Sequence, residues 1–202
     1  MASALIVDFG GVLTTNVFES FRAFSEAEGL DPDAVRKLFR ERGEGLALLR
    51  QLERGEVEIP EFEQRFAPLL GVREAEGMVQ RLFAGVRADD RMVDAVRRVR
   101  ESGRPTGLIS NSWGGASYDR VDADELFDAT VISGEVGLHK PEPEIFRLGA
   151  ERLGVTPEEC VFVDDLRENC EGAEAVGMTA ILHRGADGTI PELRRLLDVE
   201  LG

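Results

Sequence analysis

The stretch ALIVDFGGVLT, residues 4–14, decides the fold of this chain. Its first four residues, Ala4–Val7, form a short apolar run of the kind that becomes a buried strand in a parallel sheet. The run ends at a carboxylate, Asp8, with two glycines close behind it. Ligands of parallel sheets collect at the carboxyl ends of strands. Asp8 is therefore the first candidate for a nucleophile.

The rest of the chain alternates strand and helix patterns around that first run. Four more short apolar runs predict strands at Thr106–Ile109, Ala129–Ile132, Cys160–Val163 and Thr179–Leu182. Helical patterns occupy Met92–Glu101, Pro143–Leu153, Asn169–Val176 and Ile190–Val199. We expect Pro191 in the first turn of the last helix, where proline is favoured. This alternation predicts an α/β fold with a doubly wound parallel sheet.

Residues 15–88 break this alternation, because they contain no convincing buried strand. Amphipathic helical patterns cover Val17–Glu28, Pro32–Glu41, Gly45–Arg54, Pro60–Leu70 and Glu74–Ala84. Phe18, Phe21 and Phe24 share one helical face, a spacing typical of core packing. We interpret the segment as an all-helical insert. The predicted domains are an α/β core formed by residues 1–14 and 89–202 and a helical cap formed by residues 15–88.

Composition excludes several classes of function. The 202 residues carry a formal net charge of −15, which disfavours binding to nucleic acid or anionic membranes. The sequence contains no apolar stretch long enough to span a bilayer, and its start does not look like a signal peptide. We expect a cytoplasmic protein. Cys160 and Cys170 are expected to be buried free thiols in a reducing compartment.

Polar residues follow the other predicted strands as Asp8 follows the first. Ser110 and Asn111 come after the second strand and Lys140 some residues after the third, while Asp164 and Asp165 come after the fourth. Each has an ordinary explanation when taken singly: a turn, a helix cap or solvated surface. Together they predict a site where a carboxylate attacks a phosphoryl group, Mg²⁺ is held by oxygen ligands, and donors stabilise developing charge.

Four segments resemble the four motifs of the haloacid dehalogenase-like hydrolase superfamily. They are VDFGGVLT (7–14), LISNSW (108–113), GLHKPEP (137–143) and VFVDD (161–165). The resemblance covers nearly the whole chain and implies a Rossmann-like core, and the helical insert is similar to that superfamily's small cap. The sequence is most similar to the branch that holds the phosphatase domain of mammalian soluble epoxide hydrolases and bacterial glucose-1-phosphate phosphatases.

The resemblance also implies roles for individual residues. Asp8 would be the nucleophile and a Mg²⁺ ligand, with Lys140 as the second catalytic residue. Gly10 would offer its backbone carbonyl to the metal, Asp165 would complete the direct protein ligands, and Asp164, close by, would bind the metal through a water. Ser110, Asn111 and Lys140 would hold the phosphoryl group. Asn169 would brace the acidic pair. The implied partner is a small phosphorylated molecule, such as a sugar phosphate.

Gly10 departs from the pattern of the phosphatases, whose second aspartate protonates the leaving oxygen and activates water. Three hypotheses follow, in order of preference: a Mg²⁺-dependent phosphomonoester hydrolase, a catalytically weak or non-enzymatic binding protein, and a 2-haloacid dehalogenase. Against the third, dehalogenases of this kind lack the adjacent acidic pair. Intact Asp8, Lys140 and Asp165 weigh against the second.

Substrate recognition and assembly stay open at this point. Five residues are candidates to face the cleft: Thr15, Asn16, Arg42, Glu44 and Trp113. Arg42 and Trp113 are the candidates for substrate contact, against ordinary surface or packing roles. We expect the cap to move on hinges near residues 15–17 and 87–90. The oligomeric state is not encoded in any motif, and a homodimer is one alternative.

Overall fold

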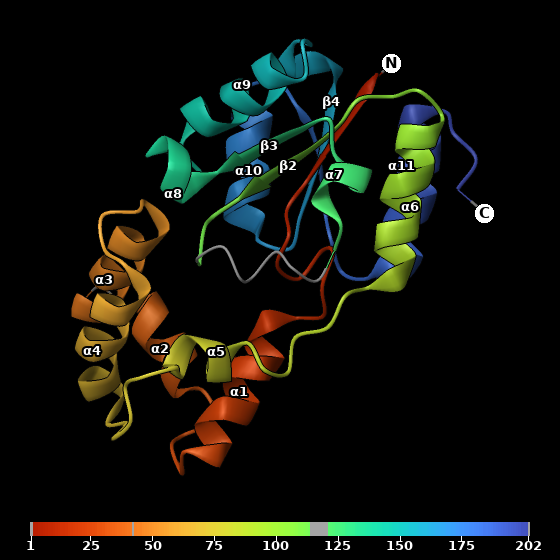
Figure 1. Cartoon of the computed structure of the whole chain (residues 1–202). Coiled ribbons are helices and arrows are strands. Elements are labelled where there is room, and N and C mark those ends of the chain that lie inside the picture. The colour runs from red at the N-terminus through yellow and green to blue at the C-terminus, as the bar shows by residue number, and fades with distance from the viewer. Residues whose placement is uncertain (1, 42, 114–120, 202) are drawn as a thin grey trace.

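A five-stranded parallel sheet forms the centre of the molecule (Figure 1). The computed structural model describes residues 2–41, 43–113 and 121–201. Its strands are β1 (Ala4–Val7), β2 (Thr106–Ser110), β3 (Ala129–Ile132), β4 (Cys160–Asp164) and β5 (Thr179–Leu182). They lie in the order β3-β2-β1-β4-β5, and every neighbouring pair is parallel. The strand order reverses on either side of β1, so the doubly wound α/β fold is confirmed and the crevice that binds ligands is expected at the end of β1.

Side chains alternate across the sheet, and each face is covered by a pair of helices. Helices α6 (Asp90–Glu101) and α11 (Ala186–Leu197) cover one face, and α9 (Pro143–Arg152) and α10 (Arg167–Ala175) cover the other (Figure 1). In β1, Leu5 and Val7 join the first apolar cluster, while Ala4 and Ile6 join the second. All four are fully buried, which explains why β1 is an uninterrupted apolar run.

The last helix corrects one expectation from the sequence. Helix α11 begins at Ala186, so Pro191 lies inside the helix and not in its first turn. The apolar stripe begins at Ile190, but the helix itself starts earlier, directly after Gly185. Gly185 has a φ of 127° and is the last residue of the preceding loop. Three short elements were not predicted: α7 (Ala123–Leu126), α8 (Ser133–Val136) and the 3-10 helix η2 (Pro157–Glu159).

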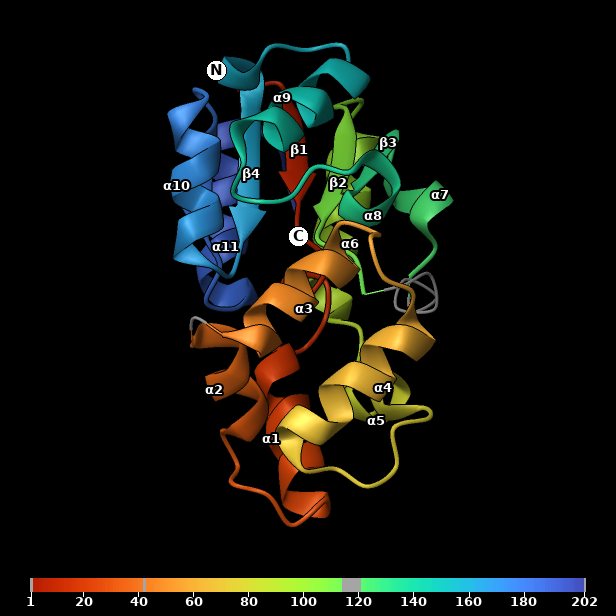
Figure 2. The same ribbon diagram turned by 90° about the vertical axis from the view of Figure 1, so that its left-hand side faces the viewer.

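Between β1 and α6, the described residues form five helices that pack around an apolar cluster of their own. They are α1 (Val17–Ala27), α2 (Ala34–Arg40), α3 (Glu44–Glu53), α4 (Ile59–Leu70) and α5 (Met78–Leu82). Phe21 and Phe24 are buried in that cluster and Phe18 packs against it, as their spacing predicts. The carboxyl ends of the strands point toward these helices (Figure 2). The division into core and cap remains a prediction.

The two connections to the helical insert run side by side. Thr14 and Ala88 form an antiparallel bridge, the Thr15 N–H donates to the Arg87 carbonyl at 2.8 Å, and the Asp89 N–H donates to the Leu13 carbonyl at 2.8 Å. The predicted hinges at residues 15–17 and 87–90 lie where these two connections pair. Among the described residues, none of the helices has the length and apolar character needed to cross a bilayer.

Candidate active site

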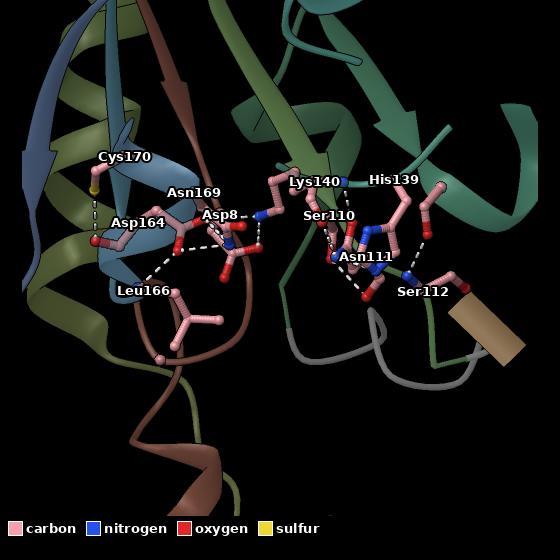
Figure 3. Close-up of polar contacts among 12 residues, drawn as sticks. Asp8, Ser110, Asn111, Ser112, His139, Lys140, Asp164, Leu166, Asn169 and Cys170 are labelled. Carbon is pink, nitrogen blue, oxygen red and sulfur yellow. Dashed lines mark hydrogen bonds and ion pairs between the residues drawn. The ribbon is translucent and has the colours of Figure 1, made fainter. Parts of the chain in front are cut away.

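Asp8 lies at the end of the central strand, with its carboxylate facing Lys140 (Figure 3). The strand pairing extends one residue past β1, because the Asp8 N–H donates to the Val163 carbonyl at 2.8 Å. Only 8% of Asp8 is exposed. The backbone therefore fixes the position of a buried carboxylate, which needs a partner inside the protein.

Lys140 is that partner, although it lies 132 residues away in the sequence. Its Nζ lies 2.6 Å from Asp8 Oδ1 and 2.8 Å from Asp164 Oδ2, and the residue is 2% exposed. Burial alone would lower the pKa of Lys140, but the charges of Asp164 and Asp8 raise it above its usual range. Lys140 is thus a buried cation and not a solvated surface lysine.

Asp164 is held on both oxygens by protein donors. Oδ1 accepts from the Leu166 N–H at 2.8 Å, Oδ2 accepts from Lys140, and Asn169 Nδ2 lies 3.0 Å from each oxygen. Asn169 thus braces this aspartate of the acidic pair, as the sequence suggested. Because its oxygens are engaged in this way, Asp164 is suited to holding Lys140 rather than to binding a metal directly.

The neighbouring Asp165 fits a metal better. One oxygen from each of Asp8, Asp164 and Asp165 lies within 4.8 Å of the others. The Asp165 carboxylate sits against Gly11, and its backbone carbonyl accepts from Arg184 Nη1 at 2.9 Å. Three carboxylates with one buried lysine leave an excess of negative charge and a set of hard oxygen donors, which suits Mg²⁺. Asp8 and Asp165 are the side chains that would hold such an ion.

The electrostatics of the carboxylates support this assignment. Burial raises the pKa of Asp8 to about 7, with Lys140 opposing and Asp164 and Asp165 adding to the rise. Burial also raises the pKa of Asp165 to about 6, helped by the charge of Asp164. Crowded carboxylates of this kind hold protons near neutral pH unless a cation replaces them.

Ser110 and Asn111 lie at the end of β2, next to Asp8 on the sheet edge (Figure 3). The Asn111 side chain forms hydrogen bonds with both backbone groups of Lys140. Its Oδ1 accepts from the Lys140 N–H at 2.9 Å, and its Nδ2 donates to the Lys140 carbonyl at 3.2 Å. Ser110 is buried at the same edge. The structure therefore brings these predicted residues together with Asp8, while their phosphoryl-binding role remains a prediction.

Trp113, Asn16 and Arg42 were among the candidates to face the substrate cleft. Trp113 packs against aromatic rings of the insert, including Phe21 and Phe62, which supports a packing role. Asn16 caps α1, because its side chain accepts from the Phe18 N–H at 2.9 Å. Arg42 lies outside the described residues.

Thr15 and Glu44, the other two candidates to face the cleft, are exposed. Cys160 and Cys170 are buried free thiols, as predicted. Sequence reasoning missed the contact of His139 with Glu53, since the two lie 86 residues apart and no motif connects them.

Replacing Gly11 by alanine is expected to weaken Mg²⁺ binding by about 10- to 100-fold, the usual effect of disturbing a ligand's surroundings. Gly11 has a φ of 80°, and an added Cβ would lie 2.6 Å from Asp165 Oδ2, so Asp165 must move. At Gly10 the nearest atom to an added Cβ is Val17 Cγ1 at 3.5 Å, an ordinary contact. Titration calorimetry on the two alanine variants checks this contrast. Equal Mg²⁺ affinities would contradict the placement of Asp165.

Comparison of the sequence with known proteins gives one family match and several relatives. Residues 2–177 match the family model described as haloacid dehalogenase-like hydrolase. The phosphorylated carbohydrates phosphatase of Thermotoga maritima is 30% identical over 199 residues, covering 88% of this chain and 83% of that protein. Bifunctional epoxide hydrolase 2 of Sus scrofa is 26% identical over 218 residues; the match covers 98% of this chain but only 39% of that longer protein.

Solved structures show the same fold. A family enzyme from Bacteroides thetaiotaomicron, crystallised with magnesium and inorganic phosphate, has a TM-score of 0.67 at 23% identity, covering 90% of this chain and 93% of that one. A likeness at this level of identity extends to the arrangement of strands and helices.

Proposed function

The chain belongs to the haloacid dehalogenase-like hydrolase family, and from that premise we propose that it hydrolyses small phosphomonoesters with Mg²⁺ through an aspartyl-phosphate on Asp8. The observation that carries the proposal is the buried Asp8 carboxylate at the end of the central strand, paired with Lys140 and adjacent to Asp165. The name of the Thermotoga relative supports phosphorylated carbohydrates as the substrate class.

The contacts support the proposed roles of the side chains, and the family resemblance supports that of the Gly10 carbonyl. Mg²⁺, when bound, offsets the repulsion between the phosphate and the carboxylates. Asp8 and Asp165 would hold it, with the Gly10 carbonyl as a further ligand, and Asp164 would keep Lys140 in place. Lys140, which stays charged, would neutralise the phosphoryl oxygens together with Ser110 and Asn111.

The reaction would proceed in two displacements. A carboxylate oxygen of Asp8 forms a bond to phosphorus while the ester P–O bond breaks, and the leaving oxygen takes the bonding electrons and then a proton from water. The oxygen of a second water then forms a bond to phosphorus while the P–O bond to Asp8 breaks and its electrons return to the carboxylate. The proton that this water loses neutralises the hydroxide left by the first water, and inorganic phosphate is released. Because Gly10 has no proton to give, leaving groups that depart as stable anions should react best.

Two alternative functions account for fewer of these contacts. A dehalogenase would also use an aspartate nucleophile and no second acid, but it has no need for the acidic pair that lies beside Asp8. A non-catalytic binding protein would not need a buried lysine held against the nucleophile. Both observations favour the phosphatase.

A panel of phosphomonoesters tests the proposal. We expect phosphate release that requires Mg²⁺, is abolished by EDTA, and is fastest with p-nitrophenyl phosphate and sugar 1-phosphates. Metal-independent chloride release from 2-chloropropionate would favour the dehalogenase. Bound Mg²⁺ without turnover of any ester would favour the binding protein.

The affinity for Mg²⁺ is expected to rise with pH up to about 7. The raised pKa values of Asp8, about 7, and Asp165, about 6, mean that the metal must displace protons below those values. Without metal, the folded state binds these protons more tightly than the unfolded chain. These groups therefore stabilise the fold at low pH, and that contribution is lost progressively as pH rises from 3.8, their ordinary pKa, to about 6 for Asp165 and about 7 for Asp8.

The stabilisation by Mg²⁺ should consequently be largest above pH 7. Melting temperatures with and without Mg²⁺ between pH 5 and 8.5 measure it, and calorimetry in buffers of different ionisation enthalpy counts the protons released. A stabilisation that does not change across this range would contradict the prediction.

A further inference from the structure

The segment of residues 110–113 follows β2 and carries two of the proposed phosphoryl donors, Ser110 and Asn111 (Figure 3). Its first half is held by the sheet body, which is the sheet with the helices that cover it. Ser110 ends β2 and pairs with β3, and the Asn111 side chain is hydrogen-bonded to the backbone of Lys140. The second half of the segment has contacts that lead to the helical insert.

The indole of Trp113 is inserted among four aromatic rings of the insert. Its centroid lies 5.2–5.8 Å from the ring centroids of Phe21, Phe39, Phe62 and Phe83. We call these four rings the Trp113 seat. Among the described residues, Trp113 is the one apolar side chain packed against the cluster of the insert that comes from outside the insert. Withdrawing the indole would expose both it and its seat to water, which is unfavourable.

The backbone of Ser112 is tied to the insert through one hydroxyl group. Ser133, a fully buried residue that begins α8, accepts from the Ser112 N–H at 2.7 Å and donates to the carbonyl of Glu53, the last residue of α3. A hydroxyl serves both partners, since it has one proton to donate and lone pairs to accept. This end of α3 lies beside α8 (Figures 1 and 2), and an added Cβ at Gly55 would lie 2.5 Å from the Gly134 carbonyl.

The insert therefore cannot leave the sheet body without disturbing the 110–113 segment. The predicted hinges, where Thr14 and Ala88 pair, would let the insert turn about them. Such a turn would either withdraw Trp113 from its seat or pull the 110–113 segment away from Asp8. In the first case the segment loses an anchor, and in the second its donors leave their place beside the nucleophile. Both weaken the binding of a phosphoryl group.

We propose that Trp113 and Ser133 couple the docking of the helical insert to the affinity of the site for phosphate, so that undocking releases the phosphate product. The coupling is reciprocal, because bound phosphate must favour the docked insert by the same factor by which docking raises phosphate affinity. Trp113 is then a positioning residue. The inference rests on the proposed function for the phosphoryl-binding role of Ser110 and Asn111, but phosphate binding can be measured without turnover.

Gly55→Ala tests the coupling by pushing the insert away from the sheet body, because its methyl group would meet the Gly134 carbonyl. Gly29→Ala is the matched control. Both glycines are exposed, lie in the insert and have a φ of 72°, but an added Cβ at Gly29 has nothing within 4 Å. In calorimetric titrations of inorganic phosphate at saturating Mg²⁺, we expect Gly55→Ala to raise Kd about tenfold, within the range usual for coupled sites. Gly29→Ala should leave Kd unchanged.

The fluorescence of Trp113 reports the docking directly, because it is the only tryptophan of the chain. The emission of Gly55→Ala should lie at a longer wavelength than that of the unmodified protein, since its indole meets water. Saturating phosphate should shift this emission back, because the coupling is reciprocal. Gly29→Ala should emit like the unmodified protein. A local effect of Gly55→Ala on α3 alone would not respond to phosphate.

A mutant cycle tests whether Trp113 and Ser133 carry the coupling. The double variant Trp113→Ala/Ser133→Ala lacks both connections between the insert and the 110–113 segment, and it should itself bind phosphate more weakly. Adding Gly55→Ala to this background should change Kd much less than tenfold, because undocking no longer moves the segment. Effects that add in full would overturn the role of the two residues.

The outcomes separate this inference from the proposed function. Thermal melting identifies the variants that fold. An unchanged phosphate Kd in folded Gly55→Ala, or equal weakening by Gly29→Ala, overturns the coupling. An emission of Gly55→Ala that phosphate does not shift also overturns it, as does a lack of phosphate binding by the unmodified protein. If the unmodified protein binds phosphate but turns over no ester, the proposed function fails, while the titrations still decide the coupling.

Discussion

Replacing Asp8 by asparagine is expected to lower kcat for phosphomonoesters by about 10⁴-fold or more, because an amide cannot form the acyl-phosphate. The variant should fold. Asparagine keeps the shape of the side chain, and Lys140 retains Asp164 as a partner at 2.8 Å. Burial of the Asp8 charge is unfavourable without metal, which is why its pKa lies near 7. Above that pH the metal-free variant should therefore melt no lower than the unmodified protein.

Three measurements check this expectation together. Steady-state phosphate release gives the rate, and acid quenching followed by mass spectrometry detects the phosphorylated protein, which should be present before and absent after the substitution. Thermal melting confirms that the variant folds. Asp124→Asn, at an exposed aspartate of α7, is the matched control and should retain full activity. Substantial turnover by a folded Asp8→Asn variant would rule out Asp8 as the nucleophile.

Replacing Gly10 by aspartate is expected to raise kcat for esters with poor leaving groups by about 10²- to 10⁴-fold, the usual contribution of a positioned acid. The position can accept a side chain, since an added Cβ meets only Val17 Cγ1, at 3.5 Å. The backbone carbonyl, which is the predicted metal ligand, is retained. The new carboxyl group would supply the proton that the alkoxide needs and that glycine cannot give.

The gain should depend on the leaving group. Nitrophenolate departs without a proton, so p-nitrophenyl phosphate should gain little, whereas an alkyl phosphate such as glycerol phosphate should gain most. Gly10→Asn has nearly the same shape but no acid, and serves as the control. If Gly10→Asp accelerates neither class of ester, or both equally, then the missing acid is not what limits the rate.

The sheet and most of the candidate site could be predicted because both depend on local patterns. Buried parallel strands must be apolar throughout, so β1 is visible as Ala4–Val7, and the residue after each strand falls on the same edge. This reasoning placed Asp8, Asn111 and Asp164 correctly at strand ends. The family resemblance then implied chemical roles for these residues, which the strand pattern alone does not imply.

The remaining features depend on contacts between distant segments. Nothing in the local pattern separates Asp164, held by Asn169 and Lys140, from Asp165, whose carboxylate faces Gly11. Likewise, Glu53 has the composition of an ordinary helix-end glutamate until the fold brings it to His139. For Trp113, the sequence left substrate contact and packing as alternatives, and its contacts with aromatic rings of the insert favour packing. Packing between separate elements decided each of these cases.

The order of strands in the sheet has a consequence for how the chain is made. β1 is synthesised before both of its neighbours, because it pairs with β2 at Thr106 and with β4 at Cys160. At roughly 5–20 residues per second, the ribosome needs on the order of ten seconds or more between β1 and its second neighbour. Until β2 is made, β1 has neither partner, and until β4 is made it has only one, whereas the helices that follow it can already make contacts with one another. Nascent chains stalled before β4 should therefore be the species that chaperones bind most strongly.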